Sequence, residues 1–147
     1  MSTDPKLLRS FACFRRLSDE QVDAIAEISN SICYPAGYVL FKEGDIGNIL
    51  YLLIDGEVEV LYEHLETGAH RVDTVSSEEV VGCAAIVPPY TYTATEKCLS
   101  DVEVLEIKID ELRNLIQKDP QLGLLLQEYI IKALNERILS LRQRDFV

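Results

Sequence analysis

The chain has 147 residues, of which 48% are hydrophobic, and a formal net charge of −11. This length and apolar content exclude a disordered chain and suit one domain with its own core. The acidic balance argues against nucleic-acid binding, which needs clustered basic residues, and the lack of a long apolar run or a secretory signal predicts a cytoplasmic protein that does not enter a membrane.

Residues 1–30 predict helices. Ser18 is a good N-cap residue, and Gln21 stands three positions later, as a capping box requires. The apolar residues that follow fall on one face of a helix. These are Val22, Ile25 and Ala26.

In residues 31–108 the apolar residues recur with a period of two, which predicts short strands bounded by turn residues. Asp55-Gly56 is a tight hairpin signal between two of them. Short strands at regular spacing favour a sandwich or barrel over alternating βα units. The expected strands are Ile32–Tyr34, Tyr38–Phe41, Ile49–Ile54, Glu57–Glu63, His70–Val75, Thr91–Cys98 and Val102–Ile107.

The segment 78–95 interrupts the strands with the layout of an anion-binding cassette. Gly82 permits a sharp turn, and the small residues after it could form one helical turn with free N–H groups. The charges oppose an anion, because Glu78 and Glu79 stand at its start and the nearest basic residue, Lys97, lies past its end. The candidate pocket residues are Gly82, Cys83, Ala84, Ala85, Tyr92, Thr93, Ala94 and Thr95.

Two interpretations of this cassette stay open. Gly82 and the Ala84-Ala85 turn either retain a ligand cradle or form only a structural corner. Tyr92 and Thr93 either present hydroxyl groups to a neutral ligand or lie on the exposed face of a strand.

Residues 109–147 predict two helices, separated at Asp119-Pro120, where an N-cap residue precedes proline at the first helical position. The second helix should run to about Gln143. It is apolar over more than one face, so it should pack against both the barrel and another chain.

The second face of this helix predicts a homodimer. Leu124, Ile131 and Ile138 recur every seven residues, the spacing of a seam between two helices. The alternative is that the preceding helix folds back and covers the seam with its own apolar residues. Those residues are Leu112, Leu115 and Ile116.

The remaining motifs predict neither an enzyme nor a metal site. No Gly-x-Ser-x-Gly, Walker or His-Glu-x-x-His motif is present. His64 and His70 lack matching ligand spacing and are expected at the surface. The four cysteines have no Cys-x-x-Cys spacing and should be free thiols, with Cys83 facing the pocket.

In this order, the helices, strands, cassette and final helix pair resemble the cyclic-nucleotide-binding domain family, above all the sensor half of catabolite-activator-type regulators. The resemblance covers about residues 11–143 and implies a mainly β fold, a β-roll or jelly roll (double-stranded β-helix) with N-terminal helices and a C-terminal helix pair. It implies a final helix that both dimerises and lines the pocket. A regulator of this type would continue into a helix-turn-helix of about 60–80 residues, so we expect a single domain over 1–147 without that module. The motifs that carry it are Tyr34-Pro35-Ala36-Gly37, Phe41-Lys42-Glu43-Gly44-Asp45, Asp55-Gly56-Glu57-Val58 and Asp101-Val102-Glu103-Val104.

The cassette departs from the family pattern where the ligand would be held. The glutamate for the ribose falls on Cys83, and the arginine for the cyclic phosphate falls on Tyr92, or on Thr91 if the loop shifts by one. A charge-assisted contact contributes about 1.5–3 kcal/mol, so its loss predicts tenfold to a hundredfold weaker binding. We therefore expect a regulatory module without a cofactor, acting through its dimer helix or a protein partner. The alternative is a cyclic nucleotide or other small ligand held by backbone N–H groups.

Overall fold

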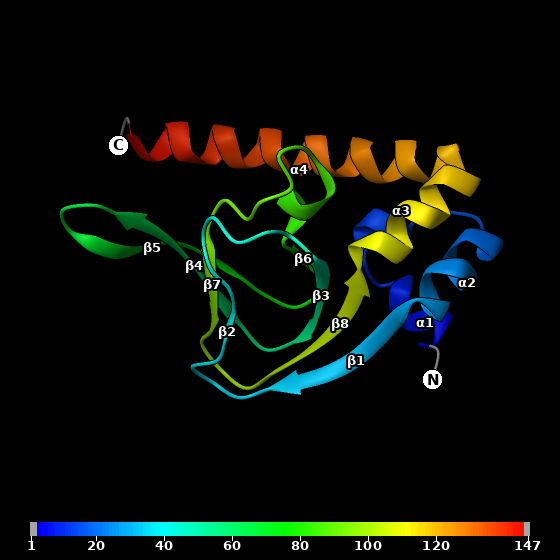
Figure 1. Cartoon of the computed structure of the whole chain (residues 1–147), viewed down its shortest axis with the longest axis horizontal. Helices are drawn as coiled ribbons and strands as arrows, with labels where there is room; N and C mark the ends of the chain where they lie inside the picture. Colours follow the sequence, from blue (N-terminus) through cyan, green and yellow to red (C-terminus); the bar gives the residue numbers. More distant parts are fainter. Residues whose placement is uncertain (1–2, 146–147) are drawn as a thin grey trace.

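The structure is a computed structural model that describes residues 3–145. It contains two four-stranded antiparallel sheets, ordered β1-β8-β3-β6 and β2-β7-β4-β5, with helices at one end and a long helix across the top (Figure 1). This confirms the mainly β fold with flanking helices. The strands are β1 Ser29–Tyr34, β2 Val39–Phe41, β3 Ile49–Asp55, β4 Val58–His64, β5 Gly68–Val75, β6 Val80–Val81, β7 Thr95–Cys98 and β8 Val102–Lys108.

The helices lie close to their expected positions. Ser18 Oγ accepts a hydrogen bond from the N–H of Gln21 at 3.1 Å, and the N–H of Ser18 donates to Gln21 Oε1 at 2.8 Å, so the capping box is confirmed. None of the described helices is long and apolar enough to cross a membrane. The helices are α1 Pro5–Leu8, η1 Ala12–Phe14, α2 Asp19–Glu27, η2 Cys83–Ile86, α3 Ile109–Lys118 and α4 Pro120–Asp145.

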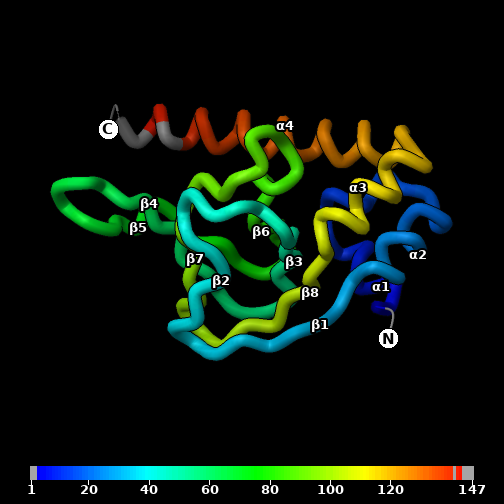
Figure 2. Tube along the Cα trace, viewed as in Figure 1, coloured from blue at the N-terminus to red at the C-terminus, as the bar shows by residue number. Residues whose placement is uncertain are grey.

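The strand expected from Thr91 to Cys98 is shorter, because β7 begins only at Thr95. Thr91 instead forms an isolated bridge with Ile46. The intervening residues belong to the cassette loop, which contains η2 between β6 and β7. Figure 2 shows this loop reaching towards α4.

The hairpin expected at Asp55-Gly56 is wrong. Strands β3 and β4 belong to different sheets, so this turn crosses from one sheet to the other. Ser100 and Asp101, between β7 and β8, lie beside it, and the N–H of Leu99 donates to the carbonyl of Glu57 at 2.9 Å. A two-residue turn signal reports a tight reversal, but it does not determine whether the flanking strands pair.

Gly56 is required at this crossing for two reasons. Its φ is +100°, and a Cβ built on it would stand 2.6 Å from the carbonyl oxygen of Asp101. Gly37 has a similar φ of +89°, but a Cβ there would meet nothing within 4 Å.

The pair separates backbone strain from crowding. Gly37→Ala should lower the free energy of unfolding by about 1–2 kcal/mol, the cost of a left-handed conformation. Gly56→Ala should lower it by about 1–3 kcal/mol more, because the two turns must also move apart. Urea unfolding of both variants measures the difference, and equal losses would contradict the crowding argument.

Candidate functional site

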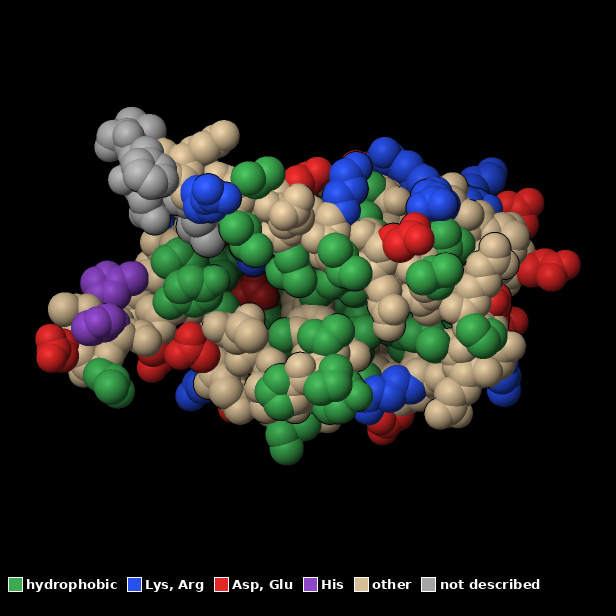
Figure 3. Space-filling model, turned by 90° about the horizontal axis from the view of Figure 1, so that it is seen from above, with side chains coloured by type: hydrophobic (Ala, Val, Ile, Leu, Met, Phe, Trp, Pro, Cys, Tyr) green, Lys and Arg blue, Asp and Glu red, His purple; other side chains and the backbone are tan. Residues whose placement is uncertain are grey.

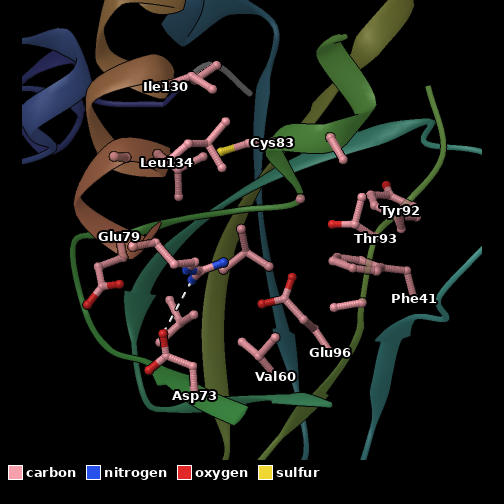
Figure 4. Close-up of a pocket in the computed structure, with 18 of the residues that line it drawn as sticks. Phe41, Val60, Asp73, Glu79, Cys83, Tyr92, Thr93, Glu96, Ile130 and Leu134 are labelled. Atoms are coloured by element: carbon pink, nitrogen blue, oxygen red, sulfur yellow. Dashed lines mark ion pairs between the residues drawn. The ribbon is translucent and has the colours of Figure 1, made fainter. Parts of the chain in front are cut away.

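A cavity of about 570 Å³ lies among the sheet β2-β7-β4-β5, the cassette loop and α4. Figure 3, seen from the α4 side, shows a hollow bordered by hydrophobic side chains with an acidic side chain inside it. The side chains from strands, loop and helix converge on this space in Figure 4. Because elements distant in sequence all contribute to it, this cavity is the candidate site.

Most of the predicted pocket residues reach the cavity, but two do not. Ala85 is fully buried under Gly47, where a Cβ would stand only 2.5 Å from that of Ala85. The hydroxyl of Thr95 accepts a hydrogen bond from the N–H of Glu43 at 2.9 Å, so it holds a turn. The predicted residues that line the cavity are Gly82, Cys83, Ala84, Tyr92, Thr93 and Ala94.

Gly82 provides the corner that aims the cassette. It has φ +86° and precedes the first residue of η2. The resemblance also assigns position 78 to a slot where the family pattern has glycine, and Glu78 has a positive φ of 72°. This left-handed conformation costs a non-glycine residue about 1–2 kcal/mol, which explains why glycine suits that slot.

The ring of Tyr92 lines the cavity, and its hydroxyl forms hydrogen bonds with the backbone. The ring stacks on Phe41 with centroids 3.7 Å apart, and the residue is only 5% exposed. Its hydroxyl donates to the carbonyl of Ile49 at 2.6 Å and accepts from the Ile49 N–H at 3.2 Å. Tyr92 therefore does not lie on an exposed face, whereas Thr93 is exposed and its hydroxyl points towards the cavity (Figure 4).

Glu96 is a candidate site residue that the sequence patterns above did not single out. It lies on β7 opposite Phe41 and Val60, lines the cavity and is 7% exposed. Within residues 3–145, its carboxylate has no hydrogen bond and no ion pair within 4 Å. Its inward direction was available from the period of two, because Ala94, Glu96 and Cys98 occupy alternate positions on one face.

Burial raises the pKa of Glu96 to about 7. Arg137, on α4, opposes this rise, and Asp73, on β5, adds to it. Arg137 is committed to Asp73 instead, with Nη2 3.5 Å from Oδ2 (dashed line in Figure 4). Burial also raises the pKa of the Cys83 thiol to about 11, so this side chain is a neutral thiol at pH 7.

Tertiary contacts correct the expectation that Lys97 is the nearest basic residue. Arg137 lines the cavity, and Arg113 donates to the carbonyl of Ala85 at 3.3 Å while lying 4.3 Å from the centroid of the Tyr90 ring. Each arginine has a partner within the protein, Asp73 for Arg137 and the Ala85 carbonyl for Arg113. Acidic groups remain in excess, since Asp73, Glu79, Glu96 and Glu136 share the lining with Arg137.

The two histidines lie at the surface, as the sequence predicts. His64 and His70 are exposed on the β4–β5 hairpin. All four cysteines are free. Among the described residues, no group of three His, Cys, Asp or Glu side chains is arranged to hold a metal ion.

A roll of two antiparallel sheets, with a helical cassette on one side of its cavity and a C-terminal helix on the other, defines the β-roll class of regulatory domains. The chain belongs to the cyclic nucleotide-binding domain family, whose model matches residues 31–119. The resemblance drawn from the sequence motifs is thus confirmed.

Individual relatives support the same family. The cyclic AMP receptor protein of Thermus thermophilus is 26% identical over 133 residues, covering 90% of this chain and 62% of that protein. A regulatory subunit of the cAMP-dependent protein kinase of Schizosaccharomyces pombe is 32% identical over 89 residues, 60% of this chain and 21% of that subunit. The crystal structure of a protein from Geobacter metallireducens assigned to cyclic nucleotide binding superposes with TM-score 0.83 and 31% identity, covering 92% of this chain and 98% of that one.

The buried glutamate predicts a characteristic pH dependence. Its folded-state pKa lies above the ordinary value of 4.5, so the folded state holds the proton more tightly than the unfolded state. The associated stability is present at low pH and is lost as the pH rises from about 4.5 to about 7. Glu96→Gln should therefore match the parent near pH 4.5 and exceed its free energy of unfolding by about 3 kcal/mol at pH 8.

The measurement is urea unfolding across this pH range, with Arg137, Asp73 and Cys83 left intact because they face Glu96. Glu63→Gln, at an exposed position on β4, is the matched control and should run parallel to the parent. Parallel curves for Glu96→Gln as well would show that Glu96 titrates normally.

Proposed function

We propose that this chain is a regulatory sensor module, not an enzyme, and that the state of its cavity reaches a second copy of the chain through α4. In this proposal the described residues act as one unit, without a nucleic-acid-binding surface of their own. The observation that supports it is the division of α4 into two faces. A single helix that borders both a cavity and a free apolar surface can relate the two.

One face of α4 borders the cavity. The helix is seated by Leu122, Leu126 and Ile130, which are buried at four-residue spacing. Any molecule in the cavity would meet this face directly. The α4 residues that line the cavity are Tyr129, Ile130, Ala133, Leu134, Glu136 and Arg137.

The other face of α4 presents the predicted seam to solvent. Leu124, Ile131 and Ile138 are 55%, 65% and 54% exposed. Helix α3 does not cover them, because it meets α4 near its start, where a Cβ on Gly123 would stand 2.6 Å from Cγ2 of Ile116. A row of large apolar side chains at seven-residue spacing favours a two-fold pair of helices.

Light scattering at micromolar concentration tests the dimer, and we expect twice the mass of one chain. Ile131→Glu should give the monomer mass, since an unpaired charge buried in a helix seam costs several kcal/mol. Lys132→Glu is the matched control, because the next residue lies about 100° around the helix and away from the seam. A parent chain that runs as a monomer would end the dimer proposal.

The cavity chemistry also predicts that cyclic AMP is not bound at micromolar concentration. Tyr92 offers no charge where the family pattern has arginine, and the acidic lining repels a phosphate. Calorimetry with cyclic AMP and cyclic GMP should show no saturable heat. A micromolar Kd would favour the alternative function, in which backbone N–H groups alone hold a cyclic nucleotide.

A gain-of-binding variant checks the cassette alignment independently. Tyr92→Arg combined with Cys83→Glu should restore measurable affinity for cyclic nucleotides, provided that circular dichroism shows an intact fold. Tyr92→Phe removes the hydroxyl that bonds Ile49 without adding a charge, so it is the control and should gain nothing. A folded double variant without affinity would mean that the aligned positions are wrong.

A further inference from the structure

We propose that the cavity binds a small apolar molecule that carries an amine or amidine group, and that the Glu96 carboxylate is the acceptor that anchors it. This inference deepens the proposed function, because it names the class of molecule that the sensor would detect. It rests on the geometry of the cavity and on the balance of charge in its lining.

The first observation is that the Glu96 carboxylate lines the cavity and has no hydrogen-bond donor among the described residues. Glu96 is 7% exposed and lines the cavity, and Figure 4 shows its carboxylate directed into the space between the strands and α4. No described residue donates a hydrogen bond to it. No buried side-chain oxygen of the described residues lacks a partner, so the Glu96 oxygens are open to the cavity. A ligand that supplies N–H groups and positive charge can therefore reach them, and a charge-assisted hydrogen bond is stronger than a neutral one.

The second observation is the distribution of charge around Glu96. Arg137 is the one basic residue in the described lining, and it is paired with Asp73 at 3.5 Å. Glu79 and Glu136 add further negative charge to the lining. The field inside the cavity therefore favours a cation and opposes the phosphate or carboxylate of an anionic ligand.

The third observation is the apolar wall. The stacked rings of Phe41 and Tyr92 form one side, and Val60, Val75 and Leu134 contribute to the others. A volume of about 570 Å³ lies within the range of small-molecule sites. The aromatic or branched aliphatic body of a ligand would pack against this wall while its charged end binds Glu96.

Binding of such a cation has a protonation signature. Burial raises the pKa of Glu96 to about 7, so a substantial fraction carries a proton near neutrality. A cation beside it favours the carboxylate and lowers that pKa, so binding releases a proton. Other titratable groups also face the cavity, and the release must therefore be assigned with a variant. They are Arg137, Asp73, Glu79, Glu136, Cys83, Tyr62, Tyr92 and Tyr129.

The experiment is calorimetry and thermal unfolding of the intact chain with benzamidine and phenethylamine, each compared with benzoate and benzamide. We expect the two cations to bind saturably and to raise the Tm, while benzoate and benzamide do neither. Glu96→Gln should weaken cation binding by about tenfold to a hundredfold, and Glu63→Gln should leave it unchanged. Calorimetry in two buffers of different ionisation enthalpy should show proton release near pH 7 in the parent and its loss in Glu96→Gln.

Either of two results would overturn this inference: neither cation binds at millimolar concentration, or Glu96→Gln binds them as the parent does. The outcome is separable from that of the proposed function. If the chain is a dimer but binds neither cation, the proposed ligand class is wrong and the dimer proposal stands. If the chain is a monomer and binds the cations through Glu96, the dimer proposal is wrong and the proposed ligand class stands.

Discussion

The packing of α4 across the β-roll is the contact on which the cavity depends. Leu122, Leu126 and Ile130 are buried against the body of the protein, and the close approach at Gly123 fixes the start of the helix beside α3. Once these residues face inwards, the helical period decides the rest. Arg137 and Leu134 must border the cavity, and Ile131 must point away from it.

The cassette has the turn and the short helix that its sequence predicts, while its side chains differ from the family pattern. Gly82 still turns the chain at positive φ, and η2 still follows it. The Tyr92 hydroxyl, in contrast, donates a hydrogen bond to the Ile49 carbonyl, so the residue presents only its aromatic ring to the cavity. The family pattern has an arginine at this position, whereas the cavity here contains the Glu96 carboxylate, and this difference is the basis of the proposal that the cavity takes a cation.

Local signals predicted the local structure well. The capping box at Ser18, the helix break at Asp119-Pro120 and most strands follow from spacing and turn residues alone. The crossing at Gly56 could not be predicted in the same way, because sheet membership depends on pairing with distant strands. Arg137 was equally inaccessible, since only the path of α4 brings it to β5. Glu96 is different, because the alternation along β7 predicts that its side chain points inward. A charged residue on an inward face indicates a candidate site, so Glu96 could have been predicted from the sequence.

The distribution of buried residues along α4 has a consequence for its local opening. Ile130 is the last described residue of the helix that is buried, so the turns beyond it have little apolar contact with the roll. Among the residues whose side chains are described, Arg137 ties these turns to β5 through its ion pair with Asp73. Both partners are substantially accessible to solvent, so salt weakens this pair. Amide hydrogen exchange should accordingly be slow in the first turns of α4 and fast in the last, with a boundary that moves with ionic strength. A partner that packs on the outer face of α4 would therefore order its last turns at a small cost in free energy. The position of that partner would determine how many turns of the helix are ordered.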